Sequence, residues 1–255
     1  DGQSAITAQY VKNMKSYILE QDHNRLMSYV SNTIWNTPQD ATALGDIIMA
    51  NDYIGTWHGN KDTRAEIKRF WDAHREMPMV ISEFGLCEPA FAGGDPRREQ
   101  IFMEKMKIYR EFGISGIIWF CLNDYRTQMG EEGEGRLRRR VHGSADLYGN
   151  PKPSYETVKR ECAPLYISSI KAVNTDERTS GVEIVIANKN ALPCYEAKGY
   201  HLAGFDGAGC LISYTTLKPL KPGETQKIFL ADAQSQLARI AIQRPNGAES
   251  ISYFI

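Results

Sequence analysis

Residues 78–85 read Pro-Met-Val-Ile-Ser-Glu-Phe-Gly, a short apolar run that ends in a carboxylate followed closely by a glycine. Short runs rich in β-branched residues are typical of strands that are buried on both faces of a parallel sheet. Glu83 then stands at the carboxyl end of the expected strand, where enzymes built on parallel strands place catalytic groups. A glutamate that faces solvent at the end of a strand is the alternative interpretation.

Three more runs of this kind occur before residue 165, at 27–30, 46–50 and 116–120. Segments with helical periodicity lie between or beside the runs, near residues 11–18, 63–74, 95–112 and 154–162. This alternation of strands and helices predicts an α/β fold with a parallel sheet built from right-handed crossovers. A doubly wound sheet and a barrel both fit the pattern.

Local signals predict where two of these helices begin. Thr63 with Glu66 three residues later has the pattern of a capping box, which places the start of one helix there. Asp95 followed by Pro96 predicts the N-cap and the first residue of another helix, which Gly113 ends.

The pattern changes after Pro164. Apolar and polar residues alternate with a period of two in residues 182–186, 226–230 and 238–242, and proline and glycine separate these segments. Such short strands favour an antiparallel β-sandwich of immunoglobulin type. We therefore expect two domains, residues 1–165 and 166–255, packed closely because no Gly/Ser-rich linker joins them.

The composition, 42% hydrophobic and 24% charged residues, is that of an ordinary globular protein. A formal net charge of −1 gives no reason to expect a nucleic-acid partner, and no apolar run approaches the roughly 20 residues of a membrane span. The polar first residues show no signal-peptide pattern. The five cysteines are scattered and form no zinc motif, so we expect no metal site and no cofactor.

Aromatic and amide residues stand at the ends of two other predicted strands. After the run at 46–50 come Asn51, Tyr53 and Trp57, and at the end of the run at 116–120 come Trp119, Phe120, Asn123 and Asp124. Aromatic faces pack against sugar rings, and amides and carboxylates bond sugar hydroxyls. Each aromatic residue taken singly also fits a core position. Together the strand ends predict a site for a carbohydrate substrate.

Taken in order, these segments resemble the C-terminal part of glycoside hydrolase family 2, which includes β-galactosidases, β-glucuronidases and β-mannosidases. Residues 22–32 resemble the approach to the family's fifth barrel strand, and residues 51–55 resemble the sixth, written Asn-x-Tyr-x-Gly. Residues 82–85 resemble the seventh, 116–125 the eighth, and 146–155 the segment that closes the barrel. The resemblance implies strands 5–8 of a (β/α)8 TIM barrel followed by a β-sandwich.

The resemblance also implies roles for single residues. Glu83 matches the family's nucleophile, and Tyr53 matches the tyrosine that bonds it. Asn51 and Trp57 would line the sugar site. Phe120 stands where the family usually has tryptophan, so the platform beneath the sugar would be altered.

Further positions concern which sugar the site would recognise. Trp119 adjoins that platform or belongs to the core, and Asn123 with Asp124 matches a pair near the sugar hydroxyls. Glucuronidases carry an Asn-x-Lys signature for the substrate carboxylate, and residues 140–142 have Arg-Val-His at its place, which disfavours a glucuronidase.

The family's retaining mechanism needs a second carboxylate, an acid/base glutamate that follows an asparagine, and this sequence contains no Asn-Glu pair. Because only four barrel strands are expected, we expect the other half of the barrel to precede Asp1. The isolated chain would then be inactive, and would pair with that half or self-associate. The predicted function is a retaining exo-β-glycosidase of β-galactosidase type. A non-catalytic carbohydrate-binding or association module is the alternative.

Overall fold

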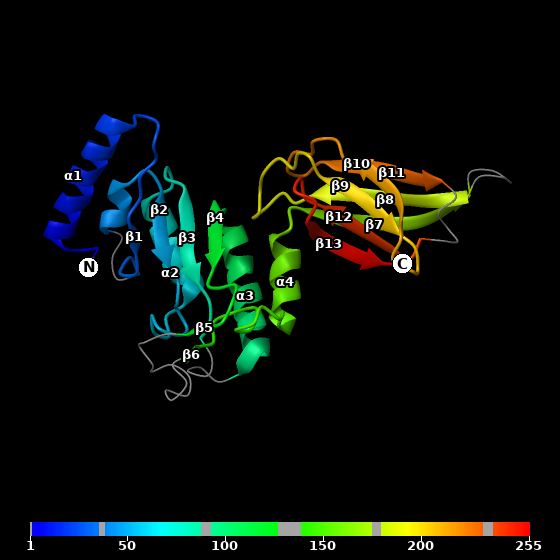
Figure 1. Ribbon diagram of the computed structural model, residues 1–255. Coiled ribbons are helices and arrows are strands. Elements are labelled where there is room, and N and C mark those ends of the chain that lie inside the picture. The colour runs from blue at the N-terminus through cyan, green and yellow to red at the C-terminus, as the bar shows by residue number, and fades with distance from the viewer. Residues whose placement is uncertain (1, 36–38, 88–92, 127–138, 175–179, 232–236) are drawn as a thin grey trace. The chain divides into compact units, whose positions relative to one another are not determined.

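The computed structural model describes residues 2–35, 39–87, 93–126, 139–174, 180–231 and 237–255. It divides into two compact units, Asp1–Val158 and Lys159–Ile255 (Figure 1). The first unit combines helices with a parallel sheet, and the second is built from antiparallel strands. The predicted order, α/β followed by all-β, is confirmed.

One parallel sheet organises the first unit. Its four strands lie side by side in chain order (Figure 1): β1 Val30–Ser31, β2 Ile48–Asn51, β3 Met79–Phe84 and β4 Gly116–Trp119. Val80 of β3 lies opposite Met49 of β2 on one side and Gly116 of β4 on the other. The carboxyl ends of all four strands therefore lie along one edge of the sheet. Closure of this sheet into a barrel stays a prediction.

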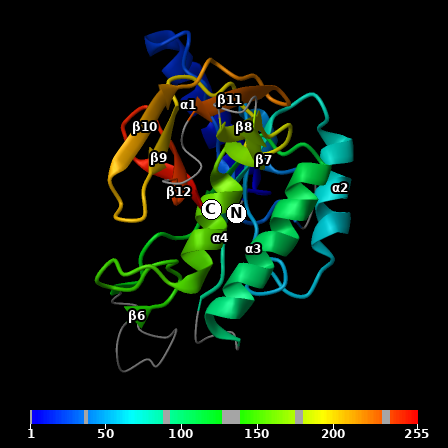
Figure 2. The same cartoon turned by 90° about the vertical axis from the view of Figure 1, so that its right-hand side faces the viewer.

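Helices precede and connect the strands. The described residues include α1 Ala5–Gln21, the 3-10 turn η1 Ala41–Leu44, α2 Thr63–Ala73, α3 Gly94–Glu111 and α4 Pro153–Cys162. Helix α2 joins β2 to β3, α3 joins β3 to β4, and the two lie next to one another (Figure 2). A short antiparallel pair, β5 (Tyr125–Arg126) with β6 (Arg139–Arg140), follows β4.

A cluster of aromatic rings holds α3 against the sheet. Phe84 of β3 packs on Phe102 and Tyr109 of α3, with ring centroids 5.9 and 5.2 Å apart, and on Trp119 of β4 at 4.9 Å. The first three rings are fully buried. Such aromatic pairs contribute about 0.5–1.5 kcal/mol each beyond the burial of their surface. Because successive residues of a strand point to opposite faces, this packing of Phe84 turns the neighbouring Glu83 away from α3.

Both predicted helix starts are late, by one residue for α2 and by two residues for α3. The N-cap of α2 is Asp62, whose carboxylate accepts hydrogen bonds from the backbone N–H groups of Arg64 and Ala65 at 2.9 and 3.2 Å. Helix α3 begins after Gly93, which has a positive φ of 117°. Asp95 does not cap α3, because its carboxylate accepts the backbone N–H and the hydroxyl of Ser154, each at 2.7 Å.

The second unit consists of two antiparallel sheets around one core. One sheet has the strand order β10-β9-β12-β13 and the other β11-β8-β7. The strands are β7 Leu165–Asn174, β8 Ser180–Asn188, β9 His201–Phe205, β10 Leu211–Thr216, β11 Thr225–Ala231, β12 Arg239–Gln243 and β13 Glu249–Phe254. Ile184 of β8 and Ile240 of β12 are both fully buried in the shared core. Immunoglobulin connectivity stays a prediction.

The cap of α2 gives a test of the revised helix start. Asp62→Ala should lower the free energy of unfolding by about 1 kcal/mol, because two N–H groups in the first turn lose their acceptor. Thr63→Ala is the matched control and should change it far less. Urea unfolding of the two variants measures the difference, and a larger loss from Thr63→Ala would restore the capping box.

Candidate active site

An irregularity in the pairing of β2 with β3 positions Glu83. Ala50 pairs with Ile81, but the next residue, Asn51, pairs with Glu83, so β3 carries one extra residue, Ser82. The backbone N–H of Asp52 then donates to the carbonyl of Glu83 at 2.7 Å. Bulges of this kind re-aim side chains next to active sites. Here the bulge brings Glu83 beside Asn51 at the carboxyl edge of the sheet.

Both carboxylate oxygens of Glu83 accept a hydrogen bond. The Tyr53 hydroxyl donates to Oε1 at 2.6 Å, and the Asn51 amide donates to Oε2 at 3.3 Å. The Ser82 hydroxyl donates to Asn51 Oδ1 at 2.9 Å, which fixes the amide with its NH₂ group toward Glu83. Burial and the bond to Glu83 raise the pKa of Tyr53 far above its usual value, so its proton stays in place. The arrangement holds the glutamate in one orientation as an acceptor.

Gly85 lets the carboxyl ends of β3 and β4 lie close to each other. A Cβ atom at this position would lie 2.1 Å from the carbonyl oxygen of Phe120, closer than any side chain allows. The contact is reinforced by a 2.9 Å hydrogen bond from the Phe120 N–H to the Phe84 carbonyl. The glycine of the Ser-Glu-Phe-Gly motif is thus required by the close approach of Phe120, whose side chain lines the site.

Glu83 lines a hollow of about 310 Å³ at this edge of the sheet. Its lining is aromatic and polar: Asn32, Asn51, Tyr53, Trp57, His58, Glu83, Phe120, Tyr125 and His142. Five of the eight residues predicted from the sequence therefore lie together, namely Asn51, Tyr53, Trp57, Glu83 and Phe120.

The other three predicted residues do not line this hollow. The Trp119 ring packs on Phe84, and its Nε1 donates to the Ser144 hydroxyl at 2.9 Å. The Asn123 amide donates to the carbonyl of Asp146 at 3.0 Å. Asp124 is buried and accepts from the Lys152 ammonium and the Gly143 N–H, at 2.8 and 2.9 Å. Their polar atoms hold the chain after β4 in place.

Four lining residues, Asn32, His58, Tyr125 and His142, are not among those predicted from the sequence. Asn32 and Tyr125 follow β1 and β4, so the strand-end signal that identified Asn51 applied to them as well. His58 and His142 follow no strand pattern. The His142 ring lies edge-on to Phe120 with centroids 5.0 Å apart and stacks beside Tyr125 at 6.1 Å.

A buried ion pair between Lys105 of α3 and Asp52 holds the carboxyl end of β2 in place. Asp52 is fully buried, and the Lys105 ammonium donates to its Oδ1 at 2.8 Å and to its carbonyl at 2.9 Å. The Tyr109 hydroxyl donates to Oδ2 at 2.6 Å. Burial lowers the pKa of Lys105, and the Asp52 charge opposes that change. Asp52 separates Asn51 from Tyr53, so α3 fixes both contacts to Glu83 through this residue.

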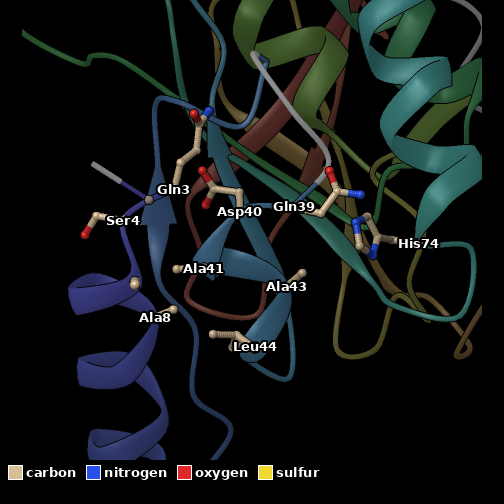
Figure 3. A pocket seen from close by; sticks show the side chains of 11 residues that line it. Gln3, Ser4, Ala8, Gln39, Asp40, Ala41, Ala43, Leu44 and His74 are labelled. Atoms are coloured by element: carbon tan, nitrogen blue, oxygen red, sulfur yellow. The ribbon is translucent and has the colours of Figure 1, made fainter.

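A second hollow, of about 420 Å³, lies beside the start of α1. Figure 3 shows Gln3, Ser4 and Ala8 on one side of it and Gln39 and His74 on the other. Its floor is apolar, with Ala41, Ala43 and Leu44. The carboxylate of Asp40 accepts hydrogen bonds from the hydroxyls of Ser31 and Thr33 and from the Thr42 N–H. We assign no chemistry to this hollow.

The described residues contain neither a candidate metal-ion cluster nor a candidate membrane span. No group of three or more His, Cys, Asp or Glu side chains in them could hold a metal ion. Nor does any helix among them have the length and apolar character to cross a membrane.

Solved structures of β-glycosidases share the fold of this chain. The FMN-binding β-glucuronidase of Faecalibacterium prausnitzii L2-6 aligns with 94% of it, at 12% identity and a TM-score of 0.51. A putative β-galactosidase of Bacteroides fragilis aligns with 97%, at 13% identity and the same TM-score. The GH2 β-galacturonidase of Eisenbergiella tayi, solved with galacturonate, aligns with 62%, at 18% identity and again 0.51.

The chain spans only about a third of these enzymes, 36%, 37% and 31% of their lengths in the same order. No protein-family model matches the sequence, and no curated protein matches it. At these identities the likeness establishes a shared fold, in agreement with the family resemblance of the sequence motifs.

The buried ion pair gives a testable prediction. Lys105→Met should lower the free energy of unfolding by about 3–5 kcal/mol, because the Asp52 carboxylate stays buried without its counter-ion. Lys107→Met, on the exposed face of α3, is the matched control and should leave it nearly unchanged. Urea unfolding measures both. A loss under about 1 kcal/mol for Lys105→Met would mean that the pair does not support the strand end.

Proposed function

We propose that this chain carries the nucleophile of a retaining exo-β-glycosidase of β-galactosidase type, and that Glu83 is that nucleophile. The observation that supports the proposal most directly is the carboxylate of Glu83, which two donors hold at the carboxyl edge of a parallel sheet and which faces a hollow lined by aromatic and amide groups. The shared fold with β-glycosidases is consistent with it.

In this reaction an oxygen of Glu83 attacks the anomeric carbon while the bond to the leaving oxygen breaks. The leaving oxygen takes a proton from a second carboxylic acid, and a glycosyl ester forms on Glu83. Water, deprotonated by that second group, then releases the sugar with its original anomeric configuration. The contact to Oε2 from Asn51 is longer than the contact to Oε1 from Tyr53, so we assign the attack to Oε2.

The hydrogen bonds to Glu83 suit this reaction. Tyr53 and Asn51 favour the ionised carboxylate, which is the form that attacks. When Oε2 bonds to the sugar carbon, Tyr53 continues to orient the ester through Oε1. Trp57, Phe120 and Tyr125 offer aromatic faces for the apolar side of a sugar ring.

The second carboxylate must come from elsewhere. Retaining glycosidases place their two carboxyl groups about 5–5.5 Å apart, and among the described lining residues Glu83 is the one carboxylate. We propose that a preceding half of a (β/α)8 barrel supplies the acid/base, either in the same polypeptide or by association. The parallel order β1-β2-β3-β4 is the order that half a barrel would have.

The single carboxylate also favours a second candidate, a module that binds carbohydrate or associates with another protein without catalysis. Hydrolysis of a chromogenic aryl β-galactoside by the full-length protein separates the two functions. Release of the chromophore supports the glycosidase, and binding of the glycoside without release supports the module.

Replacement of the nucleophile tests the proposal. Glu83→Gln should reduce turnover of an aryl β-galactoside by the full-length enzyme at least a hundredfold, because the amide is nearly isosteric but cannot act as an anionic nucleophile. Glu20→Gln, on the exposed surface of α1, is the matched control. A rate for Glu83→Gln above about a tenth of wild type, a loss under about 1.4 kcal/mol, would exclude the assignment.

A covalent trap should identify the same residue. A 2-deoxy-2-fluoro β-galactoside slows both chemical steps, so the glycosyl-enzyme accumulates and can be mapped by peptide mass spectrometry. The added mass should lie on the peptide that contains Glu83. Labelling of Asp52 or Asp124 instead would show that Glu83 is not the nucleophile. It would also show that the labelled carboxylate is not held in its buried ion pair.

A further inference from the structure

His58 lies in a tight turn that follows β2. The His58 N–H donates to the Tyr53 carbonyl at 3.0 Å, and the Gly55 N–H donates to the Gly59 carbonyl at 2.7 Å. Both glycines have positive φ values, 88° and 75°, which the turn requires. The turn brings the imidazole back over Tyr53, where their rings meet edge-on with centroids 5.7 Å apart.

The turn also determines which ring nitrogen carries the proton. The backbone N–H of Tyr53 donates to Nδ1 of His58 at 3.1 Å. A backbone N–H is always a donor, so Nδ1 must keep its lone pair, and the ring proton must reside on Nε2. Protonation of Nδ1 would bring two N–H groups face to face, and this contact therefore favours the neutral ring.

Charged groups around the ring do not reverse that preference. Burial lowers the pKa of His58; the Asp52 carboxylate opposes this change, and the Lys105 and Lys61 ammonium groups add to it. Glu83 lines the same hollow and bonds the other end of Tyr53. At neutral pH the ring is uncharged.

The Nε2–H group has no acceptor within the described part of the protein, although the ring lines the hollow. We propose that His58 is a specificity-determining residue, which donates Nε2–H to a hydroxyl oxygen of a neutral sugar in the hollow. The identity of the ligand as a sugar rests on the proposed function. A carboxylate at this point would meet a neutral donor and the negative charge of Glu83, so a hydroxyl is the better partner.

Two substitutions separate the role of Nδ1 as an acceptor from the role of Nε2 as a donor. His58→Asn places its carbonyl oxygen near the position of Nδ1, which keeps an acceptor for Tyr53 but removes the outward donor. His58→Gln places an amide near the position of Nε2, which keeps a donor but removes that acceptor. An alkyl β-thiogalactoside and its monodeoxy analogues serve as probes, because the sulfur linkage resists hydrolysis and binding is then measured independently of turnover.

Calorimetric titration of the full-length protein gives the readout. Wild type should bind one monodeoxy analogue about tenfold more weakly than the parent, since the Nε2–H donor loses its acceptor. His58→Asn should bind the parent about tenfold more weakly and show no further loss with that analogue, whereas His58→Gln should keep the discrimination. The thiogalacturonide should bind wild type more weakly than the thiogalactoside.

The inference is overturned if His58→Asn keeps the wild-type discrimination, if the thiogalacturonide binds as tightly as the thiogalactoside, or if no thiogalactoside binds. Discrimination through His58 without turnover of any aryl galactoside would refute the proposed catalysis and leave the role of His58 standing. Ring ¹⁵N shifts of His58, assigned by comparison with His58→Asn, give an independent check, and a proton on Nδ1 at neutral pH would also refute the role.

Discussion

The ion pair between Asp52 and Lys105 is the constraint on which the arrangement of the site depends. Two opposite charges are removed from water beneath the carboxyl edge of the sheet, and Tyr109 completes the set of partners. Buried pairs of this kind add little net stability compared with apolar side chains, but they tolerate few alternative geometries. Asp52 must therefore face α3, and its two neighbours in sequence, Asn51 and Tyr53, are left for the opposite side.

From that constraint a chain of hydrogen bonds crosses the site. Ser82 orients Asn51, Asn51 and Tyr53 hold Glu83, and the backbone of Tyr53 holds His58. Tyr53 is the centre of this network, because its hydroxyl, its N–H and its carbonyl each make a different contact. Linked donors and acceptors in a partly dry site polarise one another, so the network acts as a unit.

The sequence predicted the features that depend on residues close together in the chain. Buried strands have apolar runs, so β2, β3 and β4 were identifiable, whereas the run at 27–30 overlaps β1 only at Val30. The position of Glu83 marked it as a candidate catalytic group, and its role as nucleophile came from the family resemblance. The caps of α2 and α3 were misplaced because the folded contacts decide which groups a carboxylate accepts from. Asp62 accepts the first N–H groups of α2, whereas Asp95 accepts from Ser154 and leaves the start of α3 to Gly93.

Contacts between distant segments were beyond prediction from local patterns, and the contact between Tyr53 and Glu83 was expected from the family resemblance alone. Asn123 and Asp124 follow β4 much as Asn51 ends β2, but they bond Asp146 and Lys152 of the chain after β4, whereas Asn51 bonds Glu83. His58 has no periodic pattern, because a turn and not a strand or helix positions it. Its assignment required knowledge of which atom faces Nδ1.

The turn between Tyr53 and Gly59 is closed by its own backbone bonds, and a side chain at either glycine would meet open space. Its shape is therefore set mainly by its own backbone, although it adjoins the most constrained residue of the site. Exchange of other side chains at its tip would leave the strand end undisturbed, provided that the buried Ile54, the acceptor His58 and the two glycines are kept. A scaffold of this kind lets ligand preference diverge among related sequences while the chemistry at Glu83 is kept.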